Sequence, residues 1–241
     1  MITMLRADLV RLSTLRSSYA VPSAMFVLVA AITAATWSEA GSEGLTTATQ
    51  LREPLTASTG IMVAVAMAVF AAMRVAGEYR YDTMSQRLLT SPRRSRLLAA
   101  ILAFYSLLGL MVGAVALAIG LAIARPMLSA DDRSMNMTPQ IIAAVLLAVT
   151  CFSLIGVCCA VIFRSQPAAV LVIIGGLVVE KLMGMFIGDA SAYLPYGLLT
   201  PLLQLEGATI AAGTAAAVLT SITLALVATT SLAFTRRDVT T

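Results

Sequence analysis

The sequence predicts an all-α, polytopic integral membrane protein with six transmembrane helices. Three observations indicate this fold class: 59% of the 241 residues are hydrophobic, only 12% are charged, and the mean hydropathy is +0.93. Soluble globular domains contain about 45–50% apolar and about 25% charged residues. The composition therefore excludes an ordinary soluble domain, a disordered chain and a disulfide scaffold, and we expect residues 1–241 to form a single transmembrane domain.

Six segments are long and apolar enough to cross a bilayer as helices. A hydrocarbon core of about 30 Å requires about 20 apolar residues in helical form. The expected spans are residues 19–37, 57–75, 97–124, 140–163, 167–187 and 208–234.

The basic residues predict the orientation of these spans. With six spans, both termini and two internal loops share one side, and that side carries most of the 16 Lys and Arg residues. The positive-inside rule then places both termini in the cytoplasm. The Ala-rich composition, with Arg used in place of Lys, favours a bacterial source, so the expected location is the bacterial cytoplasmic membrane.

Residues 1–18 precede the first span and are predicted to form an amphipathic helix at the inner interface. Ile2, Leu5, Leu9 and Leu12 share one helical face, and charged residues lie off that face. This pattern is typical of a helix lying in the membrane surface. The alternative is a plain positively charged flank of the first span.

The longest cytoplasmic connection is residues 77–96, and it is predicted to contain a short helix over residues 78–90. Tyr81, Met84 and Leu88 recur at helical spacing and form an apolar face. Such a helix would have an apolar back and a polar front.

The polar front of this helix holds Arg80, Thr83 and Arg87. Glu78 suits the first turn, near the positive end of the helix dipole, and Pro92 ends the helix because the residue before a proline disfavours helical angles. The segment is either a solvated loop that obeys the positive-inside rule or a docking helix for a cytoplasmic partner. The residues alone leave both interpretations open.

The connection between the last two spans, residues 188–207, is apolar yet broken. Its centre, residues 193–203, combines two prolines and a glycine with several leucines. Irregular backbone at membrane depth is tolerated only where protein covers it or a wet cavity lies beside it. We therefore expect this connection to bury itself at the outer interface or to re-enter the membrane, with Tyr193 and Tyr196 at the headgroup level.

Glu180 and Lys181 are the only charges deep inside a predicted span. A lone charge at that depth costs at least about 2–3 kcal/mol. Lys181 can extend toward the headgroups, whereas the shorter Glu180 needs a partner. Glu180 either lines a translocation cavity or outer gate, or accepts hydrogen bonds from free N–H groups of residues 188–207. The structural interpretation is favoured, because a broken turn needs an acceptor.

Small and hydroxylated residues in the spans have mainly structural interpretations. Gly109 and Gly113, like Gly184 and Gly188, form G-x-x-x-G pairs that permit close helix approach, although such pairs also arise by chance in Ala-rich spans. The hydroxyls of the last span are expected to bond carbonyls of their own helix rather than a substrate. They belong to Thr209, Thr214, Thr220, Ser221 and Thr223.

Catalytic chemistry has few candidates. The chain has no histidine, and its three cysteines, Cys151, Cys158 and Cys159, lie in one apolar stretch without zinc-ligand spacing, so we interpret them as buried thiols. The only lysine, Lys181, follows Glu180 rather than glycine, so the phosphate loop G-x-x-x-x-G-K is absent. We expect no catalytic residue, metal site or cofactor in this chain. Any ATP hydrolysis must take place on another polypeptide.

Two stretches of the chain carry a recognisable pattern. The cytoplasmic loop contains, in order, Glu78, Asp82-Thr83, Leu88-Leu89, Pro92 and Ser95-Arg96. In the fifth span Glu180 precedes Leu194-Pro195-Tyr196-Gly197 and a final span. Together with the six spans and the interfacial helix, these stretches resemble the membrane subunit (permease) of type-2 ABC transporters over nearly the whole chain. Asp82 stands where the family usually has Gly, and the Lys common shortly after Arg96 is absent.

The resemblance implies two functional sites. The first is a coupling helix that docks on an ATPase subunit, and its interface comprises Glu78, Arg80, Tyr81, Asp82, Thr83, Arg87, Pro92 and Arg96. The second is a broken helical hairpin at the outer face, beside the translocation path or outer gate, and it involves Glu180, Lys181, Tyr193, Pro195 and Tyr196.

The resemblance also implies the partners. These are an ABC ATPase subunit, which would hold ATP and Mg²⁺, membrane lipid, and a second copy of the chain or a homologous permease. Gly184 and Gly188 are the candidate dimer contacts. No nucleic acid is expected.

The expected function is that of the permease half of an ATP-driven exporter for a hydrophobic or amphipathic substrate, such as a drug, antibiotic, peptide or lipid. A secondary transporter is one alternative, but the chain has no second intramembrane acid and no inverted repeat. A membrane-embedded enzyme is disfavoured by the absence of histidine. A non-transporting assembly subunit remains the third alternative, because such a role requires only packing.

Overall fold

The computed structural model describes residues 53, 55–81, 83, 94–130 and 137–236, and a few helical positions between residues 27 and 35. The expected interfacial helix (residues 1–18) and most of the expected first span (residues 19–37) lie outside the described part.

All regular elements of the described residues are helical. In chain order they are η1 (a π-helix, Ala57–Met62), α4 (Val63–Arg80), α6 (Arg94–Ala130), α7 (Pro139–Phe163), α8 (Gln166–Ile187), η2 (a 3-10 helix, Gly188–Tyr193), α9 (Leu199–Leu202) and α10 (Ala212–Arg236). Five helical stretches are long and apolar enough to cross a membrane: η1 with α4, α6, α7, α8 and α10. They coincide with the last five of the six expected spans and are the helices of a membrane-embedded protein.

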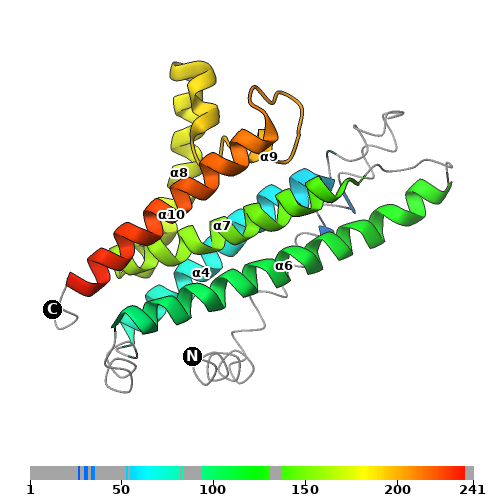
Figure 1. The fold of residues 1–241 in the computed structure, drawn as a ribbon. Helices are drawn as coiled ribbons and strands as arrows, with labels where there is room; N and C mark the ends of the chain where they lie inside the picture. The colour runs from blue at the N-terminus through cyan, green and yellow to red at the C-terminus, as the bar shows by residue number, and fades with distance from the viewer. Residues whose placement is uncertain are drawn as a thin grey trace.

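Helix α7 lies at the centre of the bundle and packs against α4, α6 and α10 (Figure 1). Close approach depends on glycines: a methyl group on Gly156 of α7 would overlap the carbonyl oxygen of Ala68 in α4. On the other side of α7, a methyl on Gly109 of α6 would lie 3.1 Å from the Cα of Thr150. The pair Gly109 and Gly113 therefore serves helix packing within this chain, where small residues let helices meet by van der Waals contact.

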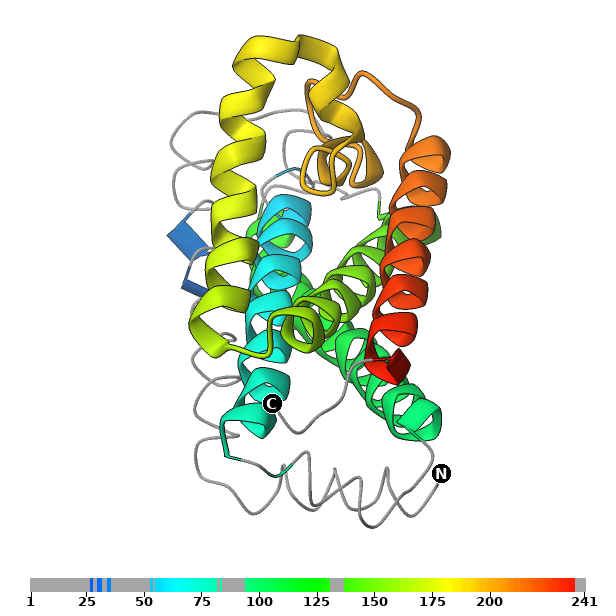
Figure 2. The same cartoon turned by 90° about the vertical axis from the view of Figure 1, so that its left-hand side faces the viewer.

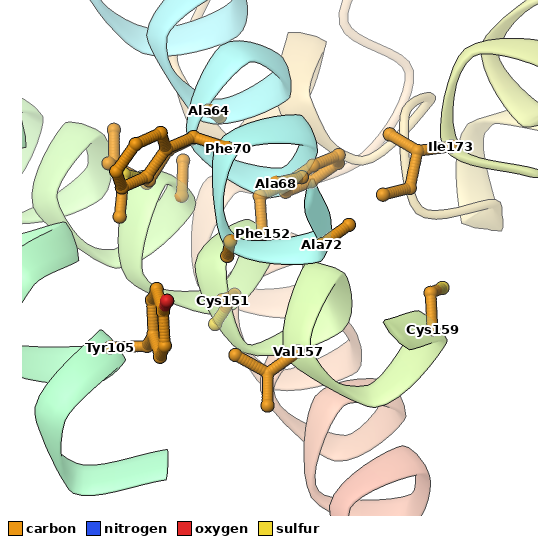
Figure 3. Close-up of a cluster of buried hydrophobic side chains, with 14 of the residues drawn as sticks. Ala64, Ala68, Phe70, Ala72, Tyr105, Cys151, Phe152, Val157, Cys159 and Ile173 are labelled. Atoms are coloured by element: carbon orange, nitrogen blue, oxygen red, sulfur yellow. The ribbon is translucent and has the colours of Figure 1, made fainter. Parts of the chain in front are cut away.

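The core around α7 is drawn in Figure 3, where side chains from α4, α6, α7 and α8 meet. Phe152 is almost fully buried in this cluster. A polar contact joins two of the helices, because the buried Ser153 hydroxyl donates to the carbonyl oxygen of Tyr105 at 2.9 Å. All three cysteines are free thiols buried in α7, which confirms their interpretation as small core side chains.

Helix α8 diverges from the rest of the bundle (Figures 1 and 2). Of its 22 residues only Ala169 and Ile173 are buried. Its far end continues into η2, and the chain then folds back into the space between α8 and α10 (Figure 2). This returning segment, rather than direct packing of α8, connects the outer half of α8 to the bundle.

The expected start of a separate helix at residue 78 is wrong. Residues 78–80 form the last turn of α4, which ends at Arg80 and is capped by Tyr81. The helix continues because no residue before Tyr81 breaks it and because the half-buried Tyr79 ring packs beneath the Arg164 guanidinium, 5.9 Å from its centroid. The remainder of the expected helix, residues 84–90, lies outside the described part.

Two other element boundaries differ from expectation. Helix α6 has 37 residues and includes Arg94–Arg96, which were expected to belong to the loop. Helix α10 begins at Ala212 rather than at residue 208. Residues 208–211 lie outside any helix, and Gly207 directly before them adopts a positive φ of 81°.

The hydroxyl groups of α10 largely confirm their expected role. Thr220, Ser221 and Thr223 each donate to the carbonyl oxygen four residues earlier, at 2.7, 2.8 and 2.8 Å. Thr209 instead precedes the helix.

The two ends of the bundle differ in charge. At one end lie the end of α4, the start of α6, the α7–α8 connection and the end of α10 (Figure 1). These segments contain Arg80, Arg94, Arg164 and Arg236. The opposite end holds Glu53 and Glu206, which are linked by a hydrogen bond from the Glu206 backbone N–H to the Glu53 carboxylate at 2.7 Å. We call these the arginine end and the acidic end.

Candidate functional site

The segment between α8 and α10 is the most irregular part of the described chain. We call residues 188–203 the broken hairpin; it comprises η2, a turn and α9. Leu198, Leu199 and Leu203 are fully buried, and a methyl group on Gly60 of η1 would lie 2.5 Å from the Leu203 side chain. The apolar connection therefore buries these leucines against the bundle, as expected for an apolar, proline-broken loop whose irregular backbone must be covered by protein.

Glu180 anchors the broken hairpin to α8. Its Oε2 accepts hydrogen bonds from the backbone N–H of Tyr196 at 2.9 Å and of Gly197 at 3.2 Å. These two donors lie in a turn, where the backbone has no regular partner. The half-buried carboxylate thus makes the backbone hydrogen bonds that the favoured interpretation expected of it.

Tyr196 provides a second attachment to the same helix. Its hydroxyl donates to the carbonyl oxygen of Ile173, about two turns before Glu180 on α8. Its ring meets Phe152 of α7 edge to face, with centroids 5.1 Å apart, and would lie 3.4 Å from a methyl group on Gly176. One side chain therefore bridges the hairpin, α8 and α7.

Glycines let the hairpin close on itself and on α8. A methyl group on Gly197 would overlap the carbonyl oxygen of Ser191. A methyl group on Gly184 would lie 3.3 Å from the hydroxyl oxygen of Ser191 in the same chain, and Gly188 ends α8 with a φ of 53°. Gly184 and Gly188, expected as dimer contacts, thus have roles within the chain, in packing and in ending the helix.

The gate residues expected from the sequence divide into two groups. Glu180 and Tyr196 lie together, and Pro195 lies in the same turn. Lys181 is exposed on α8, and Tyr193 is 52% exposed at the end of η2. The close-packed part of the site is therefore the Glu180–Tyr196 pair.

The expected coupling residues that the structure describes lie at the arginine end. Glu78, Arg80 and Tyr81 close α4, and the Thr83 hydroxyl donates to the Glu78 carbonyl at 3.2 Å. Arg96 is exposed in the first turn of α6. Asp82, Arg87 and Pro92 fall outside the described residues.

A glutamine that the sequence analysis did not single out connects this end of α4 to α8. Gln166 begins α8; its Nε2 donates to the Met73 carbonyl at 2.9 Å, and its Oε1 accepts from Arg80 Nη1 at 3.5 Å. The sequence contained an indication of this role, because Gln166, Ile173 and Glu180 are spaced seven residues apart and therefore share one face of α8. Glu53 had no such signal, because its partner lies 153 residues away.

Tyr196 offers a prediction that separates its ring from its hydroxyl. We expect Tyr196→Phe to lose only the bond to the Ile173 carbonyl, at a cost of about 1 kcal/mol. Tyr196→Ala also loses the packing on Phe152 and should cost about 3–5 kcal/mol, the range for truncating a large aromatic. Thermal unfolding of both variants in detergent checks the difference. Equal losses in the two variants would contradict the bridging role of the ring.

Comparison of the chain with protein-family models, with curated proteins and with solved structures finds no match.

Proposed function

We propose that this chain is the permease subunit of an ATP-driven exporter of the type-2 ABC kind. It would move a hydrophobic or amphipathic substrate out of a bacterial cell across the cytoplasmic membrane, with ATP and Mg²⁺ held by a separate ATPase subunit. The arginine end faces the cytoplasm and the acidic end faces outward. A second copy of the chain, or a homologous permease, completes the transporter.

One observation carries this proposal: the Glu180 carboxylate holds a broken hairpin immediately before the last span. A glutamate in the fifth span, a broken hairpin and one final span are the features on which the resemblance to this permease family rests. The five apolar helices add support through their number and order.

The positions of the two ends support a mechanism. The end of α4 leads directly into residues 82–93, the loop proposed to dock on the ATPase. The broken hairpin lies at the opposite end of the bundle (Figure 2). ATP-driven closure of the ATPase would move the end of α4, and the spans would respond by opening a path beside residues 180–203.

The test is a pull-down of the full chain from mild detergent or nanodiscs, followed by identification of co-purifying proteins and an ATPase assay. We expect a stoichiometric ATPase with the unmodified chain and its loss from the double variant Arg80→Glu/Arg87→Glu, because charge reversal would disrupt the docking helix. Arg236→Glu/Arg237→Glu is the matched control. It makes the same charge change at the arginine end but on α10 and the following residue, and should retain the ATPase.

Recovery of the chain alone under all mild conditions would refute the proposal. A secondary transporter or a non-transporting assembly subunit would then be the better hypothesis. Retention of the ATPase by the loop variant would contradict the docking site and leave the subunit assignment intact.

A further inference from the structure

One face of α8 makes contacts from the arginine end of the bundle to the broken hairpin. The residues on this face are three or four positions apart, so they lie above one another on the helix. They are Gln166, Ala169, Ile173, Gly176 and Glu180. About 21 Å of helix separates the first from the last, at 1.5 Å per residue.

Each residue of this stripe touches another element. Ala169 and Ile173 are the two buried residues of α8. The Ile173 carbonyl accepts from the Tyr196 hydroxyl, and Gly176 lies beside the Tyr196 ring. Glu180 binds the backbone of the hairpin turn. The stripe is therefore continuous, whereas the other faces of α8 are largely exposed.

At the arginine end, the stripe begins with the amide of Gln166. This group bonds the Met73 carbonyl and the Arg80 guanidinium at once, both on α4. Gly77 makes room for it, because a methyl group there would lie 3.0 Å from Gln166 Nε2. The amide thus occupies a site formed by three residues of the last turns of α4.

We propose that Gln166 is the positioning residue that couples the end of α4 to the broken hairpin, with α8 as the rigid connecting element. A displacement of Arg80 moves Gln166, and Gln166 moves α8 as a rigid body. This movement changes the contacts of Glu180 and Tyr196 with the broken hairpin. The direction of the signal, from ATPase to hairpin, rests on the proposed function. The mechanical connection between Gln166 and the hairpin does not.

The connection is tested with a cysteine reporter in the hairpin. Leu203→Cys places a thiol at a buried position packed against η1, and its labelling by a membrane-impermeant maleimide in intact cells measures opening of the hairpin. We expect Gln166→Ala to raise the labelling rate about fivefold, the factor that one net hydrogen bond is worth. The chain without the reporter corrects for the three buried native thiols.

Two further variants separate the connection from a general loss of stability. Gly77→Ala favours the α4 helix but displaces the Gln166 amide, and it should also raise the labelling rate. Gly175→Ala is the matched control, because Gly175 lies on α8 beside the stripe and has no atom within 4 Å of the added methyl; it should leave the rate unchanged. Unchanged labelling in both Gln166→Ala and Gly77→Ala would overturn the proposal, as would an equal rise in Gly175→Ala.

A second measurement uses the complex with its co-purified ATPase. A non-hydrolysable ATP analogue should change the labelling rate of the reporter in the unmodified chain and should have no effect in Gln166→Ala, although the ATPase stays bound. A full nucleotide response in Gln166→Ala would overturn the coupling role. If no ATPase co-purifies with the unmodified chain, the proposed function fails, and the labelling comparison without nucleotide still decides the role of Gln166.

Discussion

Replacing Gly156 by alanine is expected to lower the midpoint of thermal unfolding in detergent by about 4–8 °C. The added methyl group would overlap the Ala68 carbonyl oxygen, which belongs to the backbone of α4 and cannot rotate away. Overpacking of this kind costs about 3 kcal/mol, and the better helix propensity of alanine returns only about 1 kcal/mol. Each net kcal/mol is worth about 2–4 °C in a domain of this size.

The matched control is again Gly175→Ala, whose methyl group meets open space in α8. It gains the same helix propensity without the overlap, so its midpoint should stay the same or rise slightly. A Gly156→Ala protein as stable as the control would show that α4 and α7 do not pack at this distance.

The second large effect is expected at Glu180, where alanine and glutamine should behave differently. Glu180→Ala leaves the N–H groups of Tyr196 and Gly197 without their acceptor, and each unpaired buried group costs about 1–3 kcal/mol. We expect the labelling rate of the Leu203→Cys reporter to rise more than tenfold, since about 1.4 kcal/mol corresponds to a factor of ten. Glu180→Gln retains a carbonyl oxygen at the same position and should keep the rate close to that of the unmodified chain.

This pair of variants also tests the nature of the site. If Glu180 served as a gate or proton relay that depends on its charge, that function would be lost in the glutamine variant as completely as in the alanine variant. A purely structural role would be lost only in the alanine variant. Lys181→Ala is the control for removal of a neighbouring charge, because the Lys181 side chain is exposed on the other side of α8. It should leave the reporter unchanged.

Much of the helical architecture could be predicted because it depends on local composition. The observed α7, Pro139–Phe163, differs by one residue from the expected span 140–163. Hydropathy identifies such a helix because every residue of a long apolar run contributes to the same signal. The prediction of a separate helix from residue 78, made from the spacing of apolar residues, failed, because the end of α4 lies where Tyr79 packs against Arg164, a contact between residues distant in sequence.

The candidate site could be predicted in part. A carboxylate in a span needs a partner, and a broken turn nearby has free N–H donors, so hydrogen bonding of Glu180 to residues 188–207 was the favoured interpretation, with a position in a translocation cavity or outer gate as the alternative. That the donors are Tyr196 and Gly197 in particular did not follow. It depends on the path of the turn, which in turn requires that Gly197 pass directly against the Ser191 carbonyl.

By itself the sequence determined that this is a helical membrane protein and where its described spans lie, and it favoured a backbone partner for Glu180. These properties depend on the free-energy cost of placing polar groups in hydrocarbon, and each residue contributes to that cost independently of its tertiary neighbours. Only the tertiary structure decided that α7 is the central helix, that Gly184 faces Ser191 of its own chain, and that Gln166 joins α8 to α4. These features depend on distances between backbones brought together from separate parts of the chain, and a local pattern contains no record of those distances.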